Sequence, residues 1–209
     1  MDRYSRVARV YDRLSAEPVY RAGRVEAVAA LGLARGERVL DVGCGTGLNL
    51  PLLTAVGPTG LVVGVDRSTR MLDVARAQVR RRGWDNVRLV HADATGLDIG
   101  LDPTLGDPAG FDAVVFTYAL SLMPDWPAAW HAATRLLRPG GRAAVVDMRL
   151  PQGRARILSP LARLACLLGG ADINAHPWTE LEKQACGDVV RRSLRGGHIQ
   201  VRTAVVAPR

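Results

Sequence analysis

The sequence feature that most restricts the fold is a run of alternating glycines directly after a short apolar segment. Gly43, Gly45 and Gly47 follow residues 38–42, which are typical of a β-strand, and a helical pattern begins at about residue 47. Glycine tolerates backbone angles that other residues avoid, and it lets a ligand approach the main chain closely. The pattern therefore predicts a tight strand-to-helix turn that faces a ligand.

Short β-branched runs alternate with helical patterns from residue 37 onward, which is typical of βαβ units on a parallel sheet. Five parallel strands are expected, at residues 38–42, 61–66, 87–93, 112–118 and 142–148. Helices are expected between them, at about residues 47–55, 68–82 and 125–138. Pro139-Gly140-Gly141 is predicted to end the last of these helices, because proline cannot continue a helix and glycine adopts its left-handed cap.

Further elements are predicted on both flanks of this core. Helices over residues 4–14 and 17–34 form the expected N-terminal lid. After the core, Ser159-Pro160 predicts the start of a helix that ends near Gly169. The sequence from Thr179 to Glu182 looks like a capping box that opens a second short helix.

The chain ends in two β-rich segments, residues 188–194 and 198–207, which a break at Gly196-Gly197 joins into a predicted hairpin. The expected fold class is therefore α/β, with a doubly wound, mostly parallel seven-stranded sheet and an antiparallel C-terminal strand. We predict one domain over residues 1–209, in which the N-terminal lid, the ligand-binding core and the C-terminal helices with the hairpin occupy residues 1–34, 37–148 and 149–209.

Positive charge is concentrated in the last third of the chain. The whole sequence carries 28 basic and 20 acidic residues, and residues 149–209 alone hold 10 basic and 4 acidic ones. Such a surface can meet anionic lipid or nucleic acid. Since no dense basic run or interleaved aromatic residues accompany it, a solvated face is expected. No nucleic-acid partner is predicted, and peripheral membrane contact stays open.

Cysteine spacing and hydropathy bear on the compartment. Cys44, Cys166 and Cys186 lack the spacing of a zinc site or a disulfide framework, so no metal is predicted and a cytoplasmic location is expected. The N-terminus lacks the apolar core of a signal peptide, and no segment approaches the roughly 18 apolar residues that span a bilayer.

Three aspartates end the first three predicted strands, namely Asp41, Asp66 and Asp93. Open α/β sheets bind ligands at this edge, where a carboxylate accepts hydrogen bonds from ribose hydroxyls or from an adenine amino group. A dinucleotide loop would carry its third glycine where Leu48 stands. The spacing therefore favours a nucleoside ligand without a pyrophosphate, and it disfavours an NAD-dependent oxidoreductase.

Five segments follow one another between residues 37 and 148: Val39 to Gly47, Gly64-Val65-Asp66 with Met71, His91-Ala92-Asp93-Ala94, Phe111-Asp112-Ala113-Val114 and Leu137 to Arg142. In this order they resemble the successive motifs of class I S-adenosylmethionine-dependent methyltransferases. The resemblance implies a Rossmann-like methyltransferase fold, with S-adenosylmethionine as the cofactor and S-adenosylhomocysteine as its product.

The resemblance also implies a set of cofactor contacts. The glycine loop approaches the methionine moiety, Asp66 holds the ribose, and Met71 packs on the adenine. The full set implied is Asp41, Gly43, Cys44, Gly45, Gly47, Asp66, Met71, Asp93, Ala94 and Thr117. Cys44 is expected to contribute its backbone and not its thiol.

A narrower resemblance concerns the substrate. The segment from Thr117 to Trp126 is similar to that of bacterial lipid headgroup N-methyltransferases, so an amine-bearing small molecule or lipid headgroup is the expected acceptor. Aromatic faces stabilise cationic amines. The residues predicted to line the substrate pocket are Tyr4, Tyr11, Tyr118 and Trp126. Tyr118 lies at a strand end and is expected to position the acceptor.

Other functions stay open. A quinone or natural-product C- or O-methyltransferase would need a general base. The candidates for it are His91, His131, His176, His198 and Asp147. A regulatory protein that binds S-adenosylmethionine without catalysis is compatible with the same glycine loop.

Residues 157–168 are very apolar and lie among Arg154, Arg156 and Arg163. A buried helix is expected here. A lid over a hydrophobic substrate and an interfacial amphipathic helix fit the same pattern. Either of these alternatives suits a lipid or prenyl-like substrate.

Overall fold

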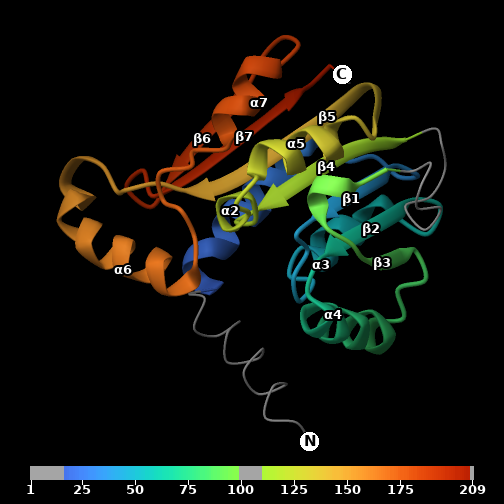
Figure 1. The fold of residues 1–209 in the computed structure, drawn as a ribbon. Helices are drawn as coiled ribbons and strands as arrows, with labels where there is room; N and C mark the ends of the chain where they lie inside the picture. The colour runs from blue at the N-terminus through green and yellow to red at the C-terminus, as the bar shows by residue number, and fades with distance from the viewer. Residues whose placement is uncertain (1–16, 99–109, 208–209) are drawn as a thin grey trace, which may run out of the picture.

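The computed structural model of the protein describes residues 17–98 and 110–207, and a seven-stranded sheet forms its centre (Figure 1). The strands are β1 (Arg38–Val42), β2 (Leu61–Asp66), β3 (Val87–His91), β4 (Phe111–Thr117), β5 (Leu137–Met148), β6 (Val190–Leu194) and β7 (Ile199–Val205). They lie in the order β3-β2-β1-β4-β5-β7-β6. β1 to β5 run parallel, and β7 pairs antiparallel with β5 and β6. The predicted mostly parallel sheet with an antiparallel C-terminal strand is confirmed.

Helices cover both faces of the sheet. The α-helices are α2 (Glu17–Leu31), α3 (Leu50–Leu53), α4 (Thr69–Arg82), α5 (Trp126–Thr134), α6 (Ser159–Gly169) and α7 (Trp178–Gln184). Short 3-10 helices are η1 (Thr54–Val56), η2 (Ala94–Gly96), η4 (Leu120–Leu122) and η5 (Gly153–Leu158). α2, α3 and α4 pack on one face, and α5 and α7 pack on the other.

Alternate residues of the central strands enter two separate cores. Val39 packs with the α2 and α3 side, whereas Leu40 and Val42 pack with Trp130 of α5 on the opposite side. A parallel sheet that is covered on both faces needs such continuous apolar strands. The pairing of Val42 with both Val65 and Phe116 then brings the carboxyl ends of β1, β2 and β4 to one edge.

One predicted helix boundary is wrong. α5 ends at Thr134, and Pro139-Gly140-Gly141 lies within β5 instead of closing a helix over residues 125–138. The Phe111 amide donates to the Leu136 carbonyl at 2.8 Å, and the β4–β5 register shifts between Phe111 and Ala113. Because sheet pairing recruits the segment after α5, the proline and glycines form an irregularity at the start of a strand.

Two predicted helix caps are also wrong. α6 spans Ser159–Gly169 with a proline in its first turn, so the predicted bounds of this helix are confirmed. Because η5 runs directly into it, however, Leu158 and not Ser159 occupies the N-cap position. α7 begins at Trp178, before the supposed capping box, and the Thr179 hydroxyl donates to the His176 carbonyl at 2.9 Å. At α7, a hydrogen bond to the preceding turn therefore takes the place of the expected cap. The helix predicted over residues 4–14 lies outside the described residues.

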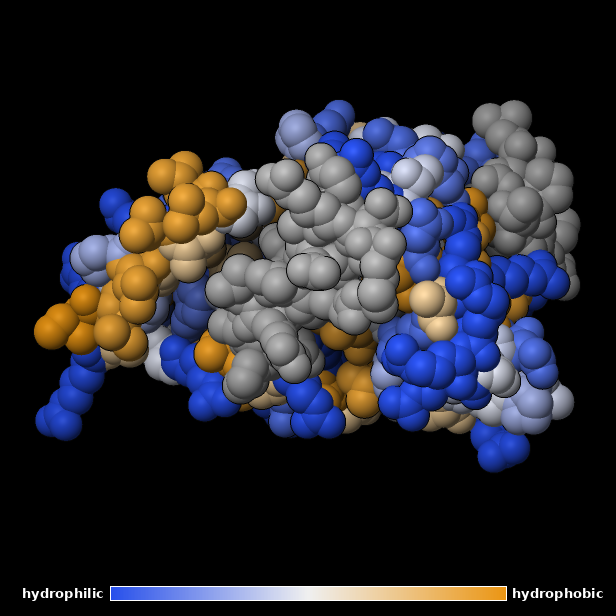
Figure 2. All heavy atoms as spheres, turned by 90° about the horizontal axis from the view of Figure 1, so that it is seen from below, coloured by the Kyte–Doolittle hydropathy of each residue, from blue (hydrophilic) through white to orange (hydrophobic). Residues whose placement is uncertain are grey.

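The apolar stretch over residues 157–168 is not a buried helix as expected. Of the side chains in α6, only Ala162 and Cys166 are buried. Figure 2 shows hydrophobic side chains gathered over this helix at one end of the molecule. The apolar composition of α6 is therefore not explained by core packing.

Candidate functional site

A cavity of about 1030 Å³ lies at the carboxyl edge of the sheet. Its walls come from the glycine loop after β1, from the segments after β2, β3 and β4, and from α2 and α6. The strand order places β3 and β2 on one side of β1, and β4 and β5 on the other. The cavity therefore runs across the strand ends from the β2–β3 side to the α6 side.

The glycine loop follows β1 and is held against β2. The amides of Gly43 and Cys44 both donate to the Val65 carbonyl, at 2.8 and 3.0 Å. A Cβ at Gly43, where φ is 70°, would lie 2.6 Å from the Ala119 Cβ, so this position has no room for a side chain. A Cβ at Gly45 would meet nothing within 4 Å. Gly45 thus presents bare backbone to open space in the cavity wall.

Asp66 ends β2 with a rigidly held carboxylate. Its two oxygens accept from the amides of Gly45 and Ser68, each at 2.8 Å. The Ser68 hydroxyl in turn caps α4 by accepting from the Met71 amide at 3.4 Å. Asp66 and Met71 both line the cavity. The first turn of α4 therefore sets the positions of two residues that were predicted from the sequence.

Asp41 does not line the cavity, although it was predicted to contact the ligand. It is fully buried, and burial raises the pKa of its carboxyl to about 7. Asn49 donates from Nδ2 to Asp41 Oδ1 and to Thr117 Oγ1, each at 2.8 Å. Because Asn49 and Thr117 do line the cavity, Asp41 reaches it only through Asn49. Sequence reasoning missed Asn49, whose only signal is its place two residues after the last glycine of the loop.

The segment after β3 forms the next part of the wall. Asp93 lines the cavity and accepts from the Thr95 amide and hydroxyl, at 2.9 and 2.8 Å. These hydrogen bonds lower the pKa of the Asp93 carboxyl. Ala94 and Met71 lie in the same wall. Gly47, also predicted here, does not line the cavity, because its α-carbon faces the Leu50 side chain.

Tyr118 lies at the end of β4 in a backbone conformation that is rare for a non-glycine residue, with φ at 54°. Its amide donates to the Val146 carbonyl at 2.7 Å and its hydroxyl to the Tyr20 carbonyl at 2.9 Å. Burial raises the pKa of the Tyr118 hydroxyl. The Arg24 guanidinium carbon lies 5.9 Å from the ring centroid, and the Tyr20 ring lies 4.9 Å from it. All three side chains line the cavity.

The other predicted substrate residues do not join Tyr118. Trp126 lies outside the cavity lining, where it is half-buried against the core beneath α5. Tyr4 and Tyr11 lie outside the described residues. An aromatic cage of these four side chains is therefore not formed by the described part of the chain.

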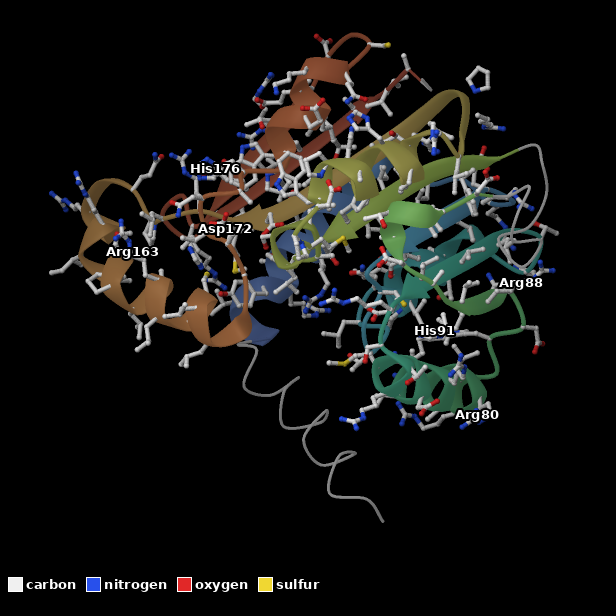
Figure 3. All side chains as sticks on the ribbon, in the orientation of Figure 1. Arg80, Arg88, His91, Arg163, Asp172 and His176 are labelled. Atoms are coloured by element: carbon white, nitrogen blue, oxygen red, sulfur yellow. The ribbon has the colours of Figure 1, made fainter. Side chains whose placement is uncertain are left out.

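None of the five candidate general bases lines the cavity. Asp147 is buried against Ser121, whose hydroxyl donates to it at 2.7 Å, and burial raises the pKa of its carboxyl to about 6. His91 lies beside α4 and is exposed, and His176 belongs to the segment between α6 and α7 (Figure 3). His131 belongs to α5. His198 contacts the cavity wall from behind, through the Tyr20 hydroxyl at 3.4 Å.

Residues 17–98 and 110–207 contain neither a candidate metal centre nor a membrane-spanning helix. No group of three or more His, Cys, Asp or Glu side chains there could hold a metal ion. No helix in this part of the chain is both long and apolar enough to span a membrane.

Comparison with known proteins identifies the family. A model of the methyltransferase domain matches residues 39–141, which cover β1 through the start of β5 with the glycine loop and Asp66. The strand order and the cavity at the carboxyl edge agree with this match. The chain belongs to the class I S-adenosylmethionine-dependent methyltransferases. The cofactor expected from the glycine loop is thereby S-adenosylmethionine.

Curated relatives of this methyltransferase include the demethylmenaquinone methyltransferases of Staphylococcus aureus strains JH9 and Newman. The strain JH9 protein is 32% identical over 152 residues, which are 71% of this chain and 59% of the relative. The strain Newman protein gives the same values. The chain therefore spans less than two thirds of the length of these relatives.

Solved structures share the fold of this methyltransferase. A SAM-dependent methyltransferase from Aquifex aeolicus has a TM-score of 0.66 at 19% identity, covering 99% of this chain and 100% of its own. Haemonchus contortus phosphoethanolamine N-methyltransferase 2, solved with phosphomonomethylethanolamine and S-adenosylhomocysteine, has a TM-score of 0.67 at 17% identity. The match covers 89% of this chain and 52% of that one. At these identities the likeness concerns the fold alone.

Proposed function

We propose that this methyltransferase transfers a methyl group from S-adenosylmethionine to a ring carbon of an apolar quinol. The similarity to demethylmenaquinone methyltransferases at 32% identity supports the acceptor class. The observation that carries the proposal is that the Tyr118 ring already contacts Arg24 and the Tyr20 ring inside the cavity. The products are the methylated quinol, S-adenosylhomocysteine and a proton.

Residues at the β1–β2 side fit the cofactor. Gly45 leaves open space against its backbone, and Asp66 offers a carboxylate whose position two amides hold. We assign the methionine moiety to the glycine loop, the ribose to Asp66 and the adenine to the wall of Met71 and Asp93. S-adenosylmethionine supplies an activated methyl group when it is bound, so the protein needs no nucleophile of its own.

Residues at the α6 side fit an apolar acceptor. The side chains there are almost all uncharged and include Ala119, Met123, Met148, Ala165, Cys166, Leu168 and Ala171. A quinol ring with an alkyl or prenyl substituent can bury its carbon atoms against such a surface. A phosphorylated headgroup would lose its hydration on this apolar surface, which costs free energy. Arg24 is the cation that this part of the described lining offers to compensate for the loss.

The amine acceptor expected from the sequence has less support. A methylated ammonium product needs an open aromatic face. The Tyr118 ring instead contacts a guanidinium and a second ring, and Trp126 lies outside the cavity. The positive charge of Arg24 beside this ring favours an acceptor that develops negative charge, as a quinol does when it loses its hydroxyl proton.

The test offers the protein two acceptors with tritiated S-adenosylmethionine. One is a chemically reduced short-chain demethylmenaquinone, and the other is phosphatidylethanolamine in vesicles. We expect labelled, ring-methylated quinol, identified by mass spectrometry, and no labelled lipid. Label in the amine lipid alone would refute the quinol proposal. Tight binding of S-adenosylhomocysteine with no product from either acceptor would favour the regulatory alternative instead.

A further inference from the structure

The exposed apolar side chains of the described residues are concentrated on one helix. Among eight large exposed hydrophobic residues, six lie in η5 and α6: Ile157, Leu158, Leu161, Leu164, Leu167 and Leu168, which are 52–84% exposed. We call these six the α6 patch. Figure 2 shows a hydrophobic area over α6 at one end of the molecule. Soluble proteins rarely expose a large contiguous apolar patch unless it is a binding site.

The geometry of α6 places most of this patch on its outer side, and Leu168 alone of the six also lines the cavity. Ala162 and Cys166 face inward and are buried against Met148 and Ile173, while the leucines at positions 161, 164 and 167 recur on the outer side. Ala165 and Leu168 contribute to the cavity lining. One helix thus carries an exposed apolar face and, beside it, part of the wall of the substrate cavity.

The charged residues around the α6 patch indicate which kind of partner binds it. Arg154 and Arg156 precede the patch, Arg163 lies within it, and all three are exposed. An apolar face bordered by arginines fits a bilayer that contains anionic lipid, because the leucines enter the acyl region while the guanidinium groups stay at the phosphates. We propose that the α6 patch docks this methyltransferase on an anionic membrane surface, with the α6 side of the cavity toward the lipid.

The choice of lipid over a protein partner rests on the proposed function, because an apolar quinol partitions into the bilayer and would reach the cavity along α6. Vesicle binding is measured without any methyl acceptor. The docking proposal can therefore fail while quinol methylation succeeds, and the reverse also holds.

The experiment is flotation of the protein with vesicles of phosphatidylcholine containing phosphatidylglycerol. We expect the wild-type protein to float, and the double variant Leu161→Gln/Leu167→Gln to bind at least about 10-fold more weakly, because two side chains no longer enter the acyl region. Both residues are exposed and lie outside the cavity lining, so folding is preserved. Val205→Thr, at an exposed apolar residue outside the patch, is the matched control and should bind like wild type.

A charge series completes the test. Arg163→Gln should weaken binding to anionic vesicles by about 5-fold and leave binding to pure phosphatidylcholine unchanged. Arg88→Gln is the control, since Arg88 lies on β3 at the opposite end of the molecule from Arg163 (Figure 3). Failure of the wild-type protein to float would overturn the proposal. So would a concentration-dependent dimer that the double leucine variant abolishes, because a second copy would then cover the patch.

A second inference comes from the cavity wall at Tyr20. The Arg149 carbonyl lies 2.6 Å from His198 Nδ1, and since a carbonyl only accepts, Nδ1 carries the ring proton. His198 Nε2 is then an acceptor for the Tyr20 hydroxyl at 3.4 Å. Tyr20 lines the cavity and His198 does not. The pair resembles a base held in one tautomer by a third group.

We infer that Tyr20 and His198 carry the acceptor proton away. The hydroxyl O–H bond of the acceptor breaks, its proton passes to the Tyr20 oxygen, and the original Tyr20 proton passes to His198 Nε2, which becomes an imidazolium. Tyr20 is the catalytic residue, and His198 acts through it. Titratable or charged groups around Tyr20 are Tyr118, Cys166, Asp147 and, beside Tyr118, Arg24. This inference rests on the proposed quinol acceptor.

The test is the pH profile of quinol methylation by His198→Asn, whose amide can still donate to the Arg149 carbonyl. We expect kcat to fall about 100-fold, the acidic limb of the profile to disappear, and added imidazole to restore activity. Tyr20→Phe should show the same fall without imidazole rescue, and both variants should bind S-adenosylhomocysteine like wild type. Wild-type turnover with an unchanged His198→Asn profile would overturn the relay alone. Absence of wild-type turnover would overturn the quinol proposal and the relay with it.

Discussion

At the scale of single residues, Asp41 and Asp66 show how two strand-end carboxylates acquire different environments. Asp66 lines the cavity and accepts from the amides of Gly45 and Ser68. Asp41 is fully buried, and its contact with the cavity passes through Asn49. A strand places successive side chains on opposite faces, and the surrounding packing then decides which carboxylate remains accessible. Both acids fit the sequence motif equally well.

Asp66→Ala should weaken S-adenosylhomocysteine binding by about 10- to 100-fold, because hydrogen bonds to a charged group contribute roughly 1.5–3 kcal/mol. The variant also removes the acceptor that holds the Gly45 amide. Isothermal titration calorimetry measures the change, and Asp85→Ala, at an exposed acid beyond α4, should keep the wild-type Kd. Equal affinity of Asp66→Ala and wild type would refute the ribose assignment.

At the scale of elements, α5 shows where sequence signals compete with sheet pairing. Asp125 caps its N-terminus by accepting from the Ala128 amide at 3.1 Å, which agrees with the predicted start. Its C-terminus was predicted four residues too late, because the Leu136 carbonyl accepts from Phe111 and Leu137 joins β5. Caps act within one turn, whereas the end of this helix depends on Phe111 of β4, which precedes Thr134 by 23 residues.

Asp125→Ala should lower the free energy of unfolding by about 1 kcal/mol, because the Ala128 amide loses its capping acceptor. Asp125→Ser retains a capping oxygen and should recover most of the loss. Urea denaturation followed by circular dichroism compares the two variants with wild type. If alanine and serine have equal effects, the side chain at this position does not stabilise α5 as a cap.

At the scale of the whole molecule, burial of acids ties stability to pH. The Asp41 carboxyl changes its pKa from 3.8 to about 7 on folding, chiefly through burial, with Asp66 adding to the rise and Asn49 and Arg24 opposing it. Between these pH values the folded protein binds more protons than the unfolded chain. The free energy of unfolding therefore falls as the pH rises from about 4 to 7.

Asp41→Asn should remove most of this decline, which is on the order of 2–4 kcal/mol for such a shift. Asparagine can still accept from Asn49, so the packing is retained. Urea denaturation at pH 5 and pH 8 gives the difference for each protein. A residual decline is expected from Asp147, whose pKa is also raised, to about 6. An equal decline in the variant and the wild type would show that Asp41 does not titrate in this range.

The sheet, the glycine loop and the cofactor edge could be predicted from residue patterns along the chain. Strand residues such as Val39 and Leu40 are apolar because both faces of the sheet are covered, and this pattern is local enough to read directly. Gly43, Gly45 and Asp66 were predicted for the same reason, since turn geometry and strand ends depend on near neighbours in the chain.

The contacts between distant segments could not be predicted in this way, because they depend on how the chain packs. Asn49 lies between Asp41 and Thr117, Tyr20 of α2 lies against Tyr118 and His198, and Trp126 turns into the core instead of the cavity. The exposure of the α6 leucines was likewise a matter of packing, because an apolar helix can be buried or open with the same sequence. These contacts depend on which surfaces the strand order brings together. Residue patterns along one segment do not predict them.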